Sequence, residues 1–544
     1  MSQRATMAVT LRQDYAAGRT LFERALEISR ANGDKVGEAN SLHNIGQADY
    51  ILRDFPAAID AFTKELAVGR GAGDDSAVAA ASYSLGMVAY ASGEYTSALG
   101  SYRDSLALYE KRDDGPSANR ALISIGNIQY LQADYDGATA SYRHAEALGI
   151  IGQDPQGASL ARSGLARVLA AQGDLASALD MYGRVLTDAR NAAEADPRLG
   201  NNVATTLESI GEVHFRLGNT DQARSAFDEA KRLVDADPGF SGRLYSSLGL
   251  TELVAGRYDA ALADYTESRA RFVKAKDAAS VGRAWIGAGF AQAAREKWDD
   301  AIAAYNSAIR ELAGKDEDRG RAFLGLSLAQ SGVGDNTAAL ESARKVLTLA
   351  DALKNQDLSW RGSVRAGEAL TGLAKLDEAR ASFESAIAVI ERLALDAPVD
   401  PDARAELSDS ATAWAGLAVA RAKGSDARGA LAAAEARRAH VRRMHLAAFQ
   451  SDITRGESED ERTAEQSLAR DVVAARAQLK AESAAPHPDG ARMIKLIDQL
   501  ALLTARRADQ QAQLYARLPE LAEWRGLRMP SDVDLDTLAP DAGT

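Results

Sequence analysis

Small and aromatic residues recur at a fixed spacing of forty along the first part of the chain. Around Gly86 the pattern consists of Tyr90, Gly93, Tyr95, Ala98 and Tyr102. The same offsets follow the glycines forty residues later and forty residues earlier: Gly126 with Tyr130, Tyr135, Ala138 and Tyr142, and Gly46 with Tyr50, Phe55, Ala58 and Phe62. Self-similarity at one period is typical of a repeat architecture, in which each unit is a small supersecondary motif.

The spacing within one repeat predicts two amphipathic helices. Residues three and four apart share a helix face, so the aromatic residues are expected to fill the seam between two antiparallel helices. Gly86 and Ala98 are expected where the helix backbones come close, and Gly93 supplies the turn between them. One pair cannot bury its apolar face alone, whereas stacked pairs can, and this predicts an α-solenoid.

The repeat continues along most of the chain. The residue that takes the place of Gly86, called the anchor below, recurs near residues 6, 46, 86, 126, 166, 211, 249, 289, 327, 367 and 416. Strand signals are nearly absent from the sequence. We therefore predict an all-α fold with about ten helix pairs of about 40 residues in residues 1–434, the last pair being irregular. Because residues 15–26 fit the second helix of a pair, the chain is expected to begin inside a repeat.

This pattern resembles the tetratricopeptide repeat family. The positions that carry the resemblance are Leu85, Gly86, Tyr90, Gly93, Tyr95, Ala98 and Tyr102. The period of about 40 residues is longer than the usual 34 or so, which lengthened helices would explain. The resemblance implies a right-handed α-solenoid in which the first helix of each pair lines a concave face.

The sequence changes character after residue 434. A basic segment, Glu435–His445, precedes a polar stretch and two long helical patterns over residues 463–483 and 491–518. Each pattern has an apolar stripe, and Pro486 and Pro488 interrupt the helix between them. We predict a basic helix followed by an antiparallel helical hairpin in residues 435–520. Residues 521–544, rich in Pro, Asp and Gly, are expected to be a linker-like tail.

This order of parts resembles the N-terminal half of bacterial TPR–CHAT proteins. In that family a caspase-like protease domain with a His/Cys pair follows the hairpin. The present chain has no cysteine and stops about where that domain would begin. The resemblance therefore implies a regulatory region whose C-terminal effector is a CHAT-type protease outside this chain.

Composition narrows the classes of function. The chain of 544 residues has a net charge of −13, no cysteine and six dispersed histidines. An acidic chain is a poor partner for nucleic acid or an anionic membrane, and we predict neither. Thiolate chemistry is excluded and a histidine metal cluster is unexpected. With no signal-like or membrane-spanning stretch, a cytoplasmic bacterial protein without catalytic residues or cofactor is predicted.

Two local motifs suggest chemistry and are better explained as structure. Gly287-Ala288-Gly289 has the look of a phosphate loop, yet no strand precedes it and it falls at the anchor of a repeat helix. The basic segment Glu435–His445 is more typical of a solvated helix face that packs its apolar side inward. His440 and His445 are five apart, which suits no pair of ligands on one helix face.

Arginine recurs six residues before the anchor in five repeats. In tetratricopeptide repeats the residues six and three before the anchor, and one after it, point to the concave face. We predict that the following residues bind a peptide or protein there: Asn40, His43, Asn44, Tyr83, Arg120, Asn127, Arg167, Arg243, Arg283, Arg321 and Arg361. Guanidinium groups suit carboxylates, and asparagine can hold a peptide backbone. Alternatively, each arginine pairs with an acidic residue of a neighbouring repeat and only stiffens the stack. Both roles can coexist.

The preferred function is an interaction module that binds a protein or peptide and passes the event to its own C-terminal effector. A change of superhelical pitch would carry the signal, with the hairpin as the lever. Alternatives are a stand-alone adaptor, the sensor arm of a signalling or transcription regulator, or an enzyme in its own right. The enzyme is disfavoured because no nucleophile or metal constellation is visible, and the DNA-binding regulator because no basic recognition domain is.

Overall fold

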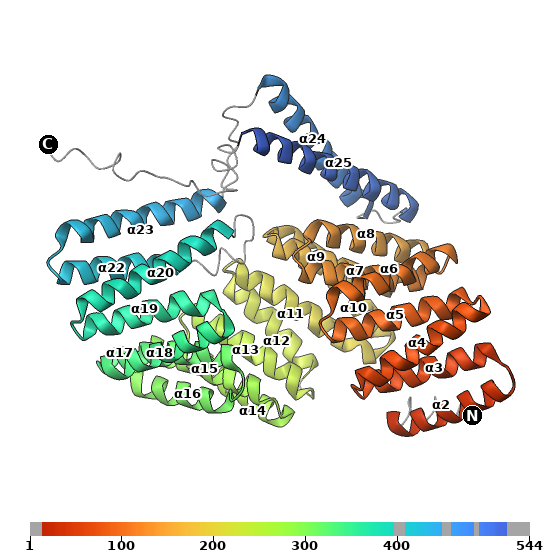
Figure 1. The fold of residues 1–544 in the computed structure, drawn as a ribbon, viewed down its shortest axis with the longest axis horizontal. Helices are drawn as coiled ribbons and strands as arrows, with labels where there is room; N and C mark the ends of the chain where they lie inside the picture. The colour runs from red at the N-terminus through yellow and green to blue at the C-terminus, as the bar shows by residue number, and fades with distance from the viewer. Residues whose placement is uncertain (1–13, 235, 397–408, 449–457, 484–488, 519–544) are drawn as a thin grey trace. The chain divides into compact units, whose positions relative to one another are not determined.

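The computed structural model describes residues 14–234, 236–396, 409–448, 458–483 and 489–518, and within these ranges it contains helices and no strand (Figure 1). In chain order the helices of the first half are α2 (Tyr15–Ala31), α3 (Lys35–Ile51), α4 (Phe55–Ala72), α5 (Asp75–Ala91), α6 (Tyr95–Lys111), α7 (Gly115–Leu131), α8 (Tyr135–Ile151), α9 (Pro155–Ala171), α10 (Leu175–Ala195) and α11 (Gly200–Arg216). A short 3₁₀ turn, Pro197–Leu199, precedes α11.

The second half continues with helices of similar length: α12 (Thr220–Leu233), α13 (Pro238–Val254), α14 (Tyr258–Ala275), α15 (Ala278–Ala294), α16 (Trp298–Glu311), α17 (Asp316–Gly332), α18 (Asn336–Leu353), α19 (Gln356–Gly372), α20 (Leu376–Asp396), α22 (Ala411–Lys423), α23 (Ala427–Ala448), α24 (Glu459–Ser483) and α25 (Gly490–Arg517). Each predicted anchor from residue 46 to 416 lies in the first helix of a pair: α3, α5 and so on to α19, then α22. The all-α solenoid of about ten pairs is confirmed. The anchor near residue 6 and the tail 521–544 lie outside the described residues.

Aspartates in the turns explain where many of these helices begin. The side chains of Asp34, Asp54, Asp74, Asp114 and Asp134 each accept a hydrogen bond from a backbone N–H in the first turn of the helix that follows. These N-caps satisfy donors that the helix leaves without a partner. The acidic turn residues are therefore structural.

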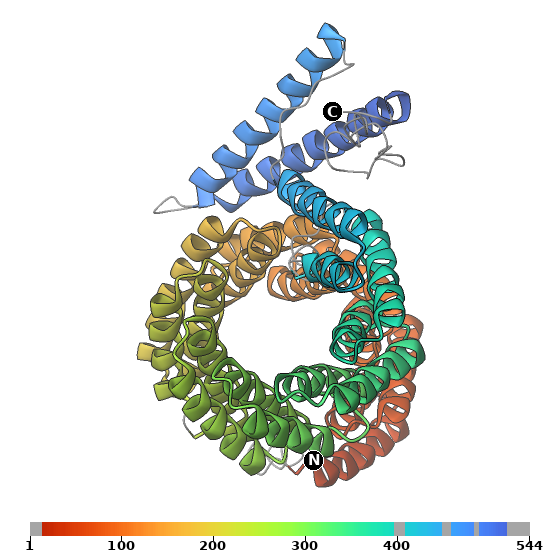
Figure 2. The same ribbon diagram turned by 90° about the vertical axis from the view of Figure 1, so that its left-hand side faces the viewer.

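The chain divides into two compact units. The first consists of Met1–Ala170, Ala176–Asp188 and Ser467–Arg507, and the second of Ala171–Leu175, Ala189–Gln466 and Ala508–Thr544. In the second unit the helices follow one another as stacked pairs along a curve, seen in Figure 2 from yellow-green α11 to teal α20. Within each pair, and between each second helix and the next first helix, the packing is direct.

In four of the described repeats one aromatic ring lies between two glycines: Tyr142, Tyr265, Tyr305 and Phe383. A Cβ atom built on Gly289 of α15 would lie 2.6 Å from the ring of Tyr305 in α16, and one built on Gly325 of α17 would lie 2.3 Å from it. Such distances leave no room for a methyl group. We expected the anchor glycine to let two backbones approach each other. The structure shows instead that it makes room for the ring sixteen residues later.

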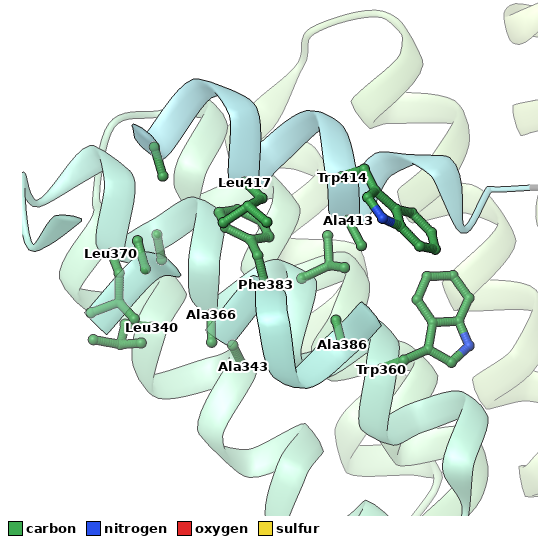
Figure 3. Packing of buried hydrophobic residues seen from close by; sticks show 14 of the residues in the cluster. Leu340, Ala343, Trp360, Ala366, Leu370, Phe383, Ala386, Ala413, Trp414 and Leu417 are labelled. Carbon is green, nitrogen blue, oxygen red and sulfur yellow. The ribbon is translucent and has the colours of Figure 1, made fainter. Parts of the chain in front are cut away.

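The same packing closes the described array at its C-terminal end. Phe383 of α20 lies between Gly367 of α19 and Gly416 of α22, with Trp360 and Trp414 nearby in one apolar cluster (Figure 3). Burial of such rings is the main favourable contribution to repeat stacking. Gly416 thus contacts the ring of the preceding repeat, as Gly287 and Gly325 do, whereas its own pair has Ala432 in place of the ring sixteen residues later.

The predicted C-terminal hairpin is present as α24 and α25. Arg517 near the end of α25 donates to Glu461 near the start of α24, which fixes an antiparallel arrangement. Apolar residues of both helices bury one another in a cluster that includes Val472, Leu479 and Met493 and also Ala147 of α8. Within the first unit the hairpin thus packs on the C-terminal part of α8. None of the described helices is long and apolar enough to cross a membrane.

Candidate functional site

The first helices of the second unit expose a single narrow stripe to solvent. On α13 the exposed residues are Arg243, Leu250 and Val254, whereas the rest of the helix is buried or half-buried. These positions are seven and four residues apart, so they share one helix face. From α11 to α19, each first helix also contacts the next first helix directly. Successive second helices in the described part are less closely packed against each other. The first helices therefore form the inner side of the curve.

The stripe has the same composition on three successive first helices. Arginine stands near the start of each, with Arg243 on α13, Arg283 on α15 and Arg321 on α17, and their side chains are 57%, 52% and 56% exposed. These three residues are called the arginine row below. Two turns further along the same helices lie Leu250, Phe290 and Leu328, called the apolar row. Leu250 and Phe290 are 43% and 41% exposed, and Leu328 is half-buried.

Acidic residues border this patch on both sides. On α11 the position of the apolar row is held by Glu212, which is exposed, with half-buried Glu208 one turn earlier. On α19 it is held by Glu368, whose pKa is raised by burial although Arg365 opposes that rise. The arginine and apolar rows are thus limited to the three helices α13, α15 and α17.

Carboxylates already contact each member of the arginine row. Arg243 lies 3.5 Å from Glu208 of the preceding first helix, and Arg283 lies 3.0 Å from Asp318 of the following one. Arg321 donates at 2.8 Å to Glu317, one turn earlier in its own helix. Two of the three arginines therefore form an ion pair with a carboxylate of a neighbouring repeat. Each guanidinium remains more than half exposed, so the pairs are weak and exchangeable.

Arg361 on α19 is held more firmly than the arginine row. Its Nε donates to Asp357 at 2.8 Å, and its guanidinium lies over the Trp360 ring at 4.4 Å. A further carboxylate, Asp409, lies 3.9 Å away. The side chain is only 29% exposed. The contacts support a structural role for this predicted site residue.

In the first unit the predicted residues Asn127 and Arg167 come together. The Arg167 Nη2 atom donates to Asn127 Oδ1 at 2.5 Å and to the Tyr142 hydroxyl at 2.8 Å, and the Tyr142 hydroxyl also donates to Asn127. The guanidinium lies over the Tyr130 ring at 4.6 Å. Arg167 is exposed and forms no ion pair within the described ranges. Its orientation is thus set by neutral partners.

Two more predicted residues lie on first helices of the first unit. Arg120 of α7 donates to Ser117 one turn earlier at 3.0 Å. The Tyr83 hydroxyl of α5 lies 3.2 Å from Ser124 Oγ of α7, and its ring packs on Tyr102 with centroids 5.1 Å apart. Tyr83 therefore links two repeats while Arg120 stays exposed.

The predicted residues of the second repeat serve mainly to join helices. His43 Nδ1 lies 3.2 Å from both carboxylate oxygens of Glu65, which is buried and whose pKa is raised by burial although His43 opposes that rise. Asn44 donates to the Asn40 carbonyl at 2.7 Å, along its own helix. Only Asn40 keeps its side chain exposed.

The structure therefore separates the predicted residues into two groups. The first group is exposed: Arg243, Arg283 and Arg321 share one face of the second unit, and Asn127 and Arg167 share a face of the first unit. The second group is largely held by contacts with neighbouring residues and consists of His43, Asn44 and Arg361. Sequence reasoning missed the apolar row. The signal was present, because Leu250 and Phe290 stand one residue after their anchors, a position that should point to the same face. No group of residues suited to holding a metal ion occurs in the described ranges.

The motif Gly287-Ala288-Gly289 lies inside α15 and is buried, as predicted for a structural segment. In the basic segment, His440 of α23 is also buried. Its Nε2 atom lies 2.8 Å from Ser410 Oγ, and its ring stacks on Trp414 at 4.3 Å. The inward side of this helix is thus structural, while Arg437 and Arg438 are exposed.

Comparison with known proteins gives matches to one family. Two tetratricopeptide repeat models match residues 2–70 and 160–197. No curated protein sequence matches the chain. Neither matched segment includes the C-terminal hairpin, so the resemblance to TPR–CHAT proteins stays a prediction.

Several solved structures share the repeat architecture at low sequence identity. The apo form of RapI is 15% identical, with a TM-score of 0.41, and the match covers 50% of this chain and 97% of that one. The quorum sensor NprR from B. thuringiensis, in its apo form, is 13% identical over 63% of this chain and 99% of that one, with a TM-score of 0.46. A Rap protein complexed with competence and sporulation factor is 13% identical over 59% and 99%, with a TM-score of 0.37.

The helix pairs and their period of about forty residues continue along the described chain beyond the two matched segments. The chain is an α-solenoid built of tetratricopeptide repeats.

Proposed function

We propose that this chain is a peptide-binding scaffold whose first-helix face binds an extended segment of a partner protein. The observation that carries the proposal is the repeated exposed stripe: three successive first helices present an arginine and, two turns away, an apolar side chain. A surface that only stiffened the stack would have no need to keep three guanidinium groups and two large apolar side chains open to water.

The arrangement favours a ligand that runs across the helices. Each helix offers one charged and one apolar contact, and successive helices repeat them at the spacing of packed helices, about 8–10 Å. Guanidinium groups bind carboxylates through two parallel hydrogen bonds, and the apolar row supplies buried area. The partner is therefore an acidic segment with interspersed apolar residues. Asn127 and Arg167 form a separate candidate contact within the first unit.

The hairpin is proposed to pass binding on to an effector that follows residues 435–520. Support comes from the apolar cluster that joins Met493 and Val472 of the hairpin to Ala147 of α8, because this contact links the hairpin to the repeats. A CHAT-type protease is the effector that the sequence resemblance implies. The array of residues 1–434 would then be the sensor and residues 521–544 the connection.

Selection from a random peptide library tests the binding function. We expect peptides retained by the wild-type chain to be acidic and apolar, and to lose at least tenfold in affinity with the variant R243A/R283A/R321A. The control R232A/R310A/R344A removes three exposed arginines from the second helices α12, α16 and α18, with the same change in net charge. Peptides that bind both variants equally well would place the binding surface elsewhere.

A further inference from the structure

The chain itself contains a segment that matches the two rows of the candidate surface. Residues 532–536 read Asp-Val-Asp-Leu-Asp, and residues 530–544 contain four aspartates and no lysine or arginine. No other stretch of the sequence alternates three acidic with apolar residues. In an extended chain successive side chains point to opposite sides, so Asp532, Asp534 and Asp536 share one edge and Val533 and Leu535 the other.

The two rows are separated by a distance that suits such an extended chain. Each apolar-row residue follows its arginine by seven positions, which is about 10.5 Å along the helix. A single extended strand placed across the helices between the rows would direct its acidic edge to the arginine row and its apolar edge to Leu250 and Phe290. Residues 532–538 span about 20 Å when extended, close to two interhelix spacings of 8–10 Å.

Charge supports the same pairing. The chain carries a net charge of −13, and the arginine row places three exposed cations on one face of it. Glu208 and Glu212 at one border and Glu368 at the other would repel an acidic segment that extended past the three helices. These borders restrict the patch to a ligand of about the length of residues 532–538.

We propose that residues 532–538 of this chain occupy the surface formed by the arginine and apolar rows, and compete there with the partner peptide. The inference rests on the proposed function, since it assigns an occupant to the same surface. The aspartates of the segment replace Glu208, Asp318 and Glu317 as partners of the arginines or share the guanidinium groups with them. Binding of a partner then requires that the segment leave.

The experiment uses a fluorescent synthetic peptide of residues 530–539 and the full chain. Fluorescence anisotropy measures binding to the wild-type chain and to the variant D532N/D534N/D536N, whose own segment no longer competes. We expect the variant to bind the peptide at least tenfold more tightly than the wild type, and added salt to weaken binding. Adding R243A/R283A/R321A to the variant should abolish the gain, whereas adding R232A/R310A/R344A should preserve it within twofold.

A second variant tests the same surface in case R243A/R283A/R321A loses binding because it does not fold. Leu250 is exposed, so Leu250→Asp should leave thermal unfolding unchanged while repelling the acidic peptide, with at least a fivefold loss of affinity. A peptide in which the three aspartates are asparagine should not bind.

Three results would overturn the inference. One is no binding of the peptide to D532N/D534N/D536N, and another is equal binding with and without the arginine row. The third is equal affinity of the wild type and D532N/D534N/D536N, which would make a separate polypeptide the occupant. If library peptides bind through the arginine row but the 530–539 peptide does not bind, the proposed function stands and only this inference is rejected.

Discussion

The ring of Tyr305 lies against Gly289, with only 2.6 Å between its Cε1 atom and the position of a Cβ atom on that glycine. A Cβ atom on Gly325 of the next first helix would lie 2.3 Å from the same ring. One aromatic side chain thus fixes the spacing of two successive first helices. Equivalent contacts surround Tyr265, between Gly249 and Gly287. The small and aromatic residues recur along the sequence with the same period as this contact between a glycine and an aromatic ring.

The variant Gly289→Ala should destabilise the protein. The new methyl group overlaps the Tyr305 ring, and overpacking of this kind costs about 1–3 kcal/mol. Denaturant unfolding measures the loss. The matched control is Gly100→Ala in α6, where nothing lies within 4 Å of the new atom, and it should gain about 0.5–1 kcal/mol from helix propensity. Stabilisation by both substitutions would show that the ring moves aside freely.

The variant Tyr305→Phe should stabilise the protein. The Tyr305 hydroxyl is buried and has no hydrogen-bond partner among the described residues. Burial also raises its pKa, although the charge of Arg365 opposes that rise. Removing an unsatisfied hydroxyl should recover about 1 kcal/mol in chemical unfolding. Tyr142→Phe is the control and should lose stability, because its hydroxyl contacts both Asn127 and Arg167.

Stability should fall as the pH rises from about 4 to 6 because of Asp264. Burial raises the pKa of this carboxyl from 3.8 to about 6, with opposing contributions from Lys231 and Arg224 and added repulsion from Glu252 and Asp228. The folded state therefore holds the proton more tightly than the unfolded state in this window. The stabilisation is complete below the unfolded pKa and is lost as the pH passes the folded one.

The variant Asp264→Asn should remove this pH dependence. Because the side chain is partly exposed, solvent screening limits the gain at neutral pH to about 1 kcal/mol. Unfolding curves at pH 4, 5, 6 and 7 measure the slope. Asp104→Asn, at an exposed position of α6, has the same change in net charge and should leave the slope as it is in the wild type. An unchanged slope in Asp264→Asn would show that Asp264 does not titrate in this range.

The pair of Arg19 and Asp49 should behave as an ion pair with a buried carboxylate, although the Arg19 side chain is 35% exposed. Arg19 Nε lies 2.5 Å from Asp49, whose side chain is only 4% exposed. Arg19→Met leaves that carboxylate without its cation and should cost about 3 kcal/mol. The double variant R19M/D49N should cost less than the sum of the two single variants.

An exposed pair of similar composition provides the comparison. Arg184 and Asp180 lie 3.1 Å apart on one helix face, with side chains 30% and 51% exposed. Arg184→Met should change stability by less than about 0.5 kcal/mol, because solvent screens the pair. Strictly additive effects in the Arg19–Asp49 cycle would contradict the buried coupling.

The helix pairs and most of their boundaries could be predicted from the sequence, and so could the residue types of the candidate surface. Anchors read from Gly46 to Gly416 lie in first helices, and the hairpin begins and ends within four residues of its predicted limits. The reason is local: in a solenoid each repeat packs on its neighbours, so a forty-residue window contains nearly all the contacts that define one repeat. The arginine row was found for the same reason.

The sequence by itself therefore determined the fold class, the repeat period and the rows of side chains. Only the tertiary structure decided which members of those rows are open to water. Arg361 has the spacing of Arg283, yet Asp357 and Trp360 occupy it, and Glu65 occupies His43. Whether a side chain is held in an ion pair, hydrogen bond or ring contact depends on the rotamers and charges of the side chains around it. A periodic pattern fixes the direction in which a residue points. The partners that it meets there come from its own helix, as for Arg361, or from a neighbouring one, as for His43.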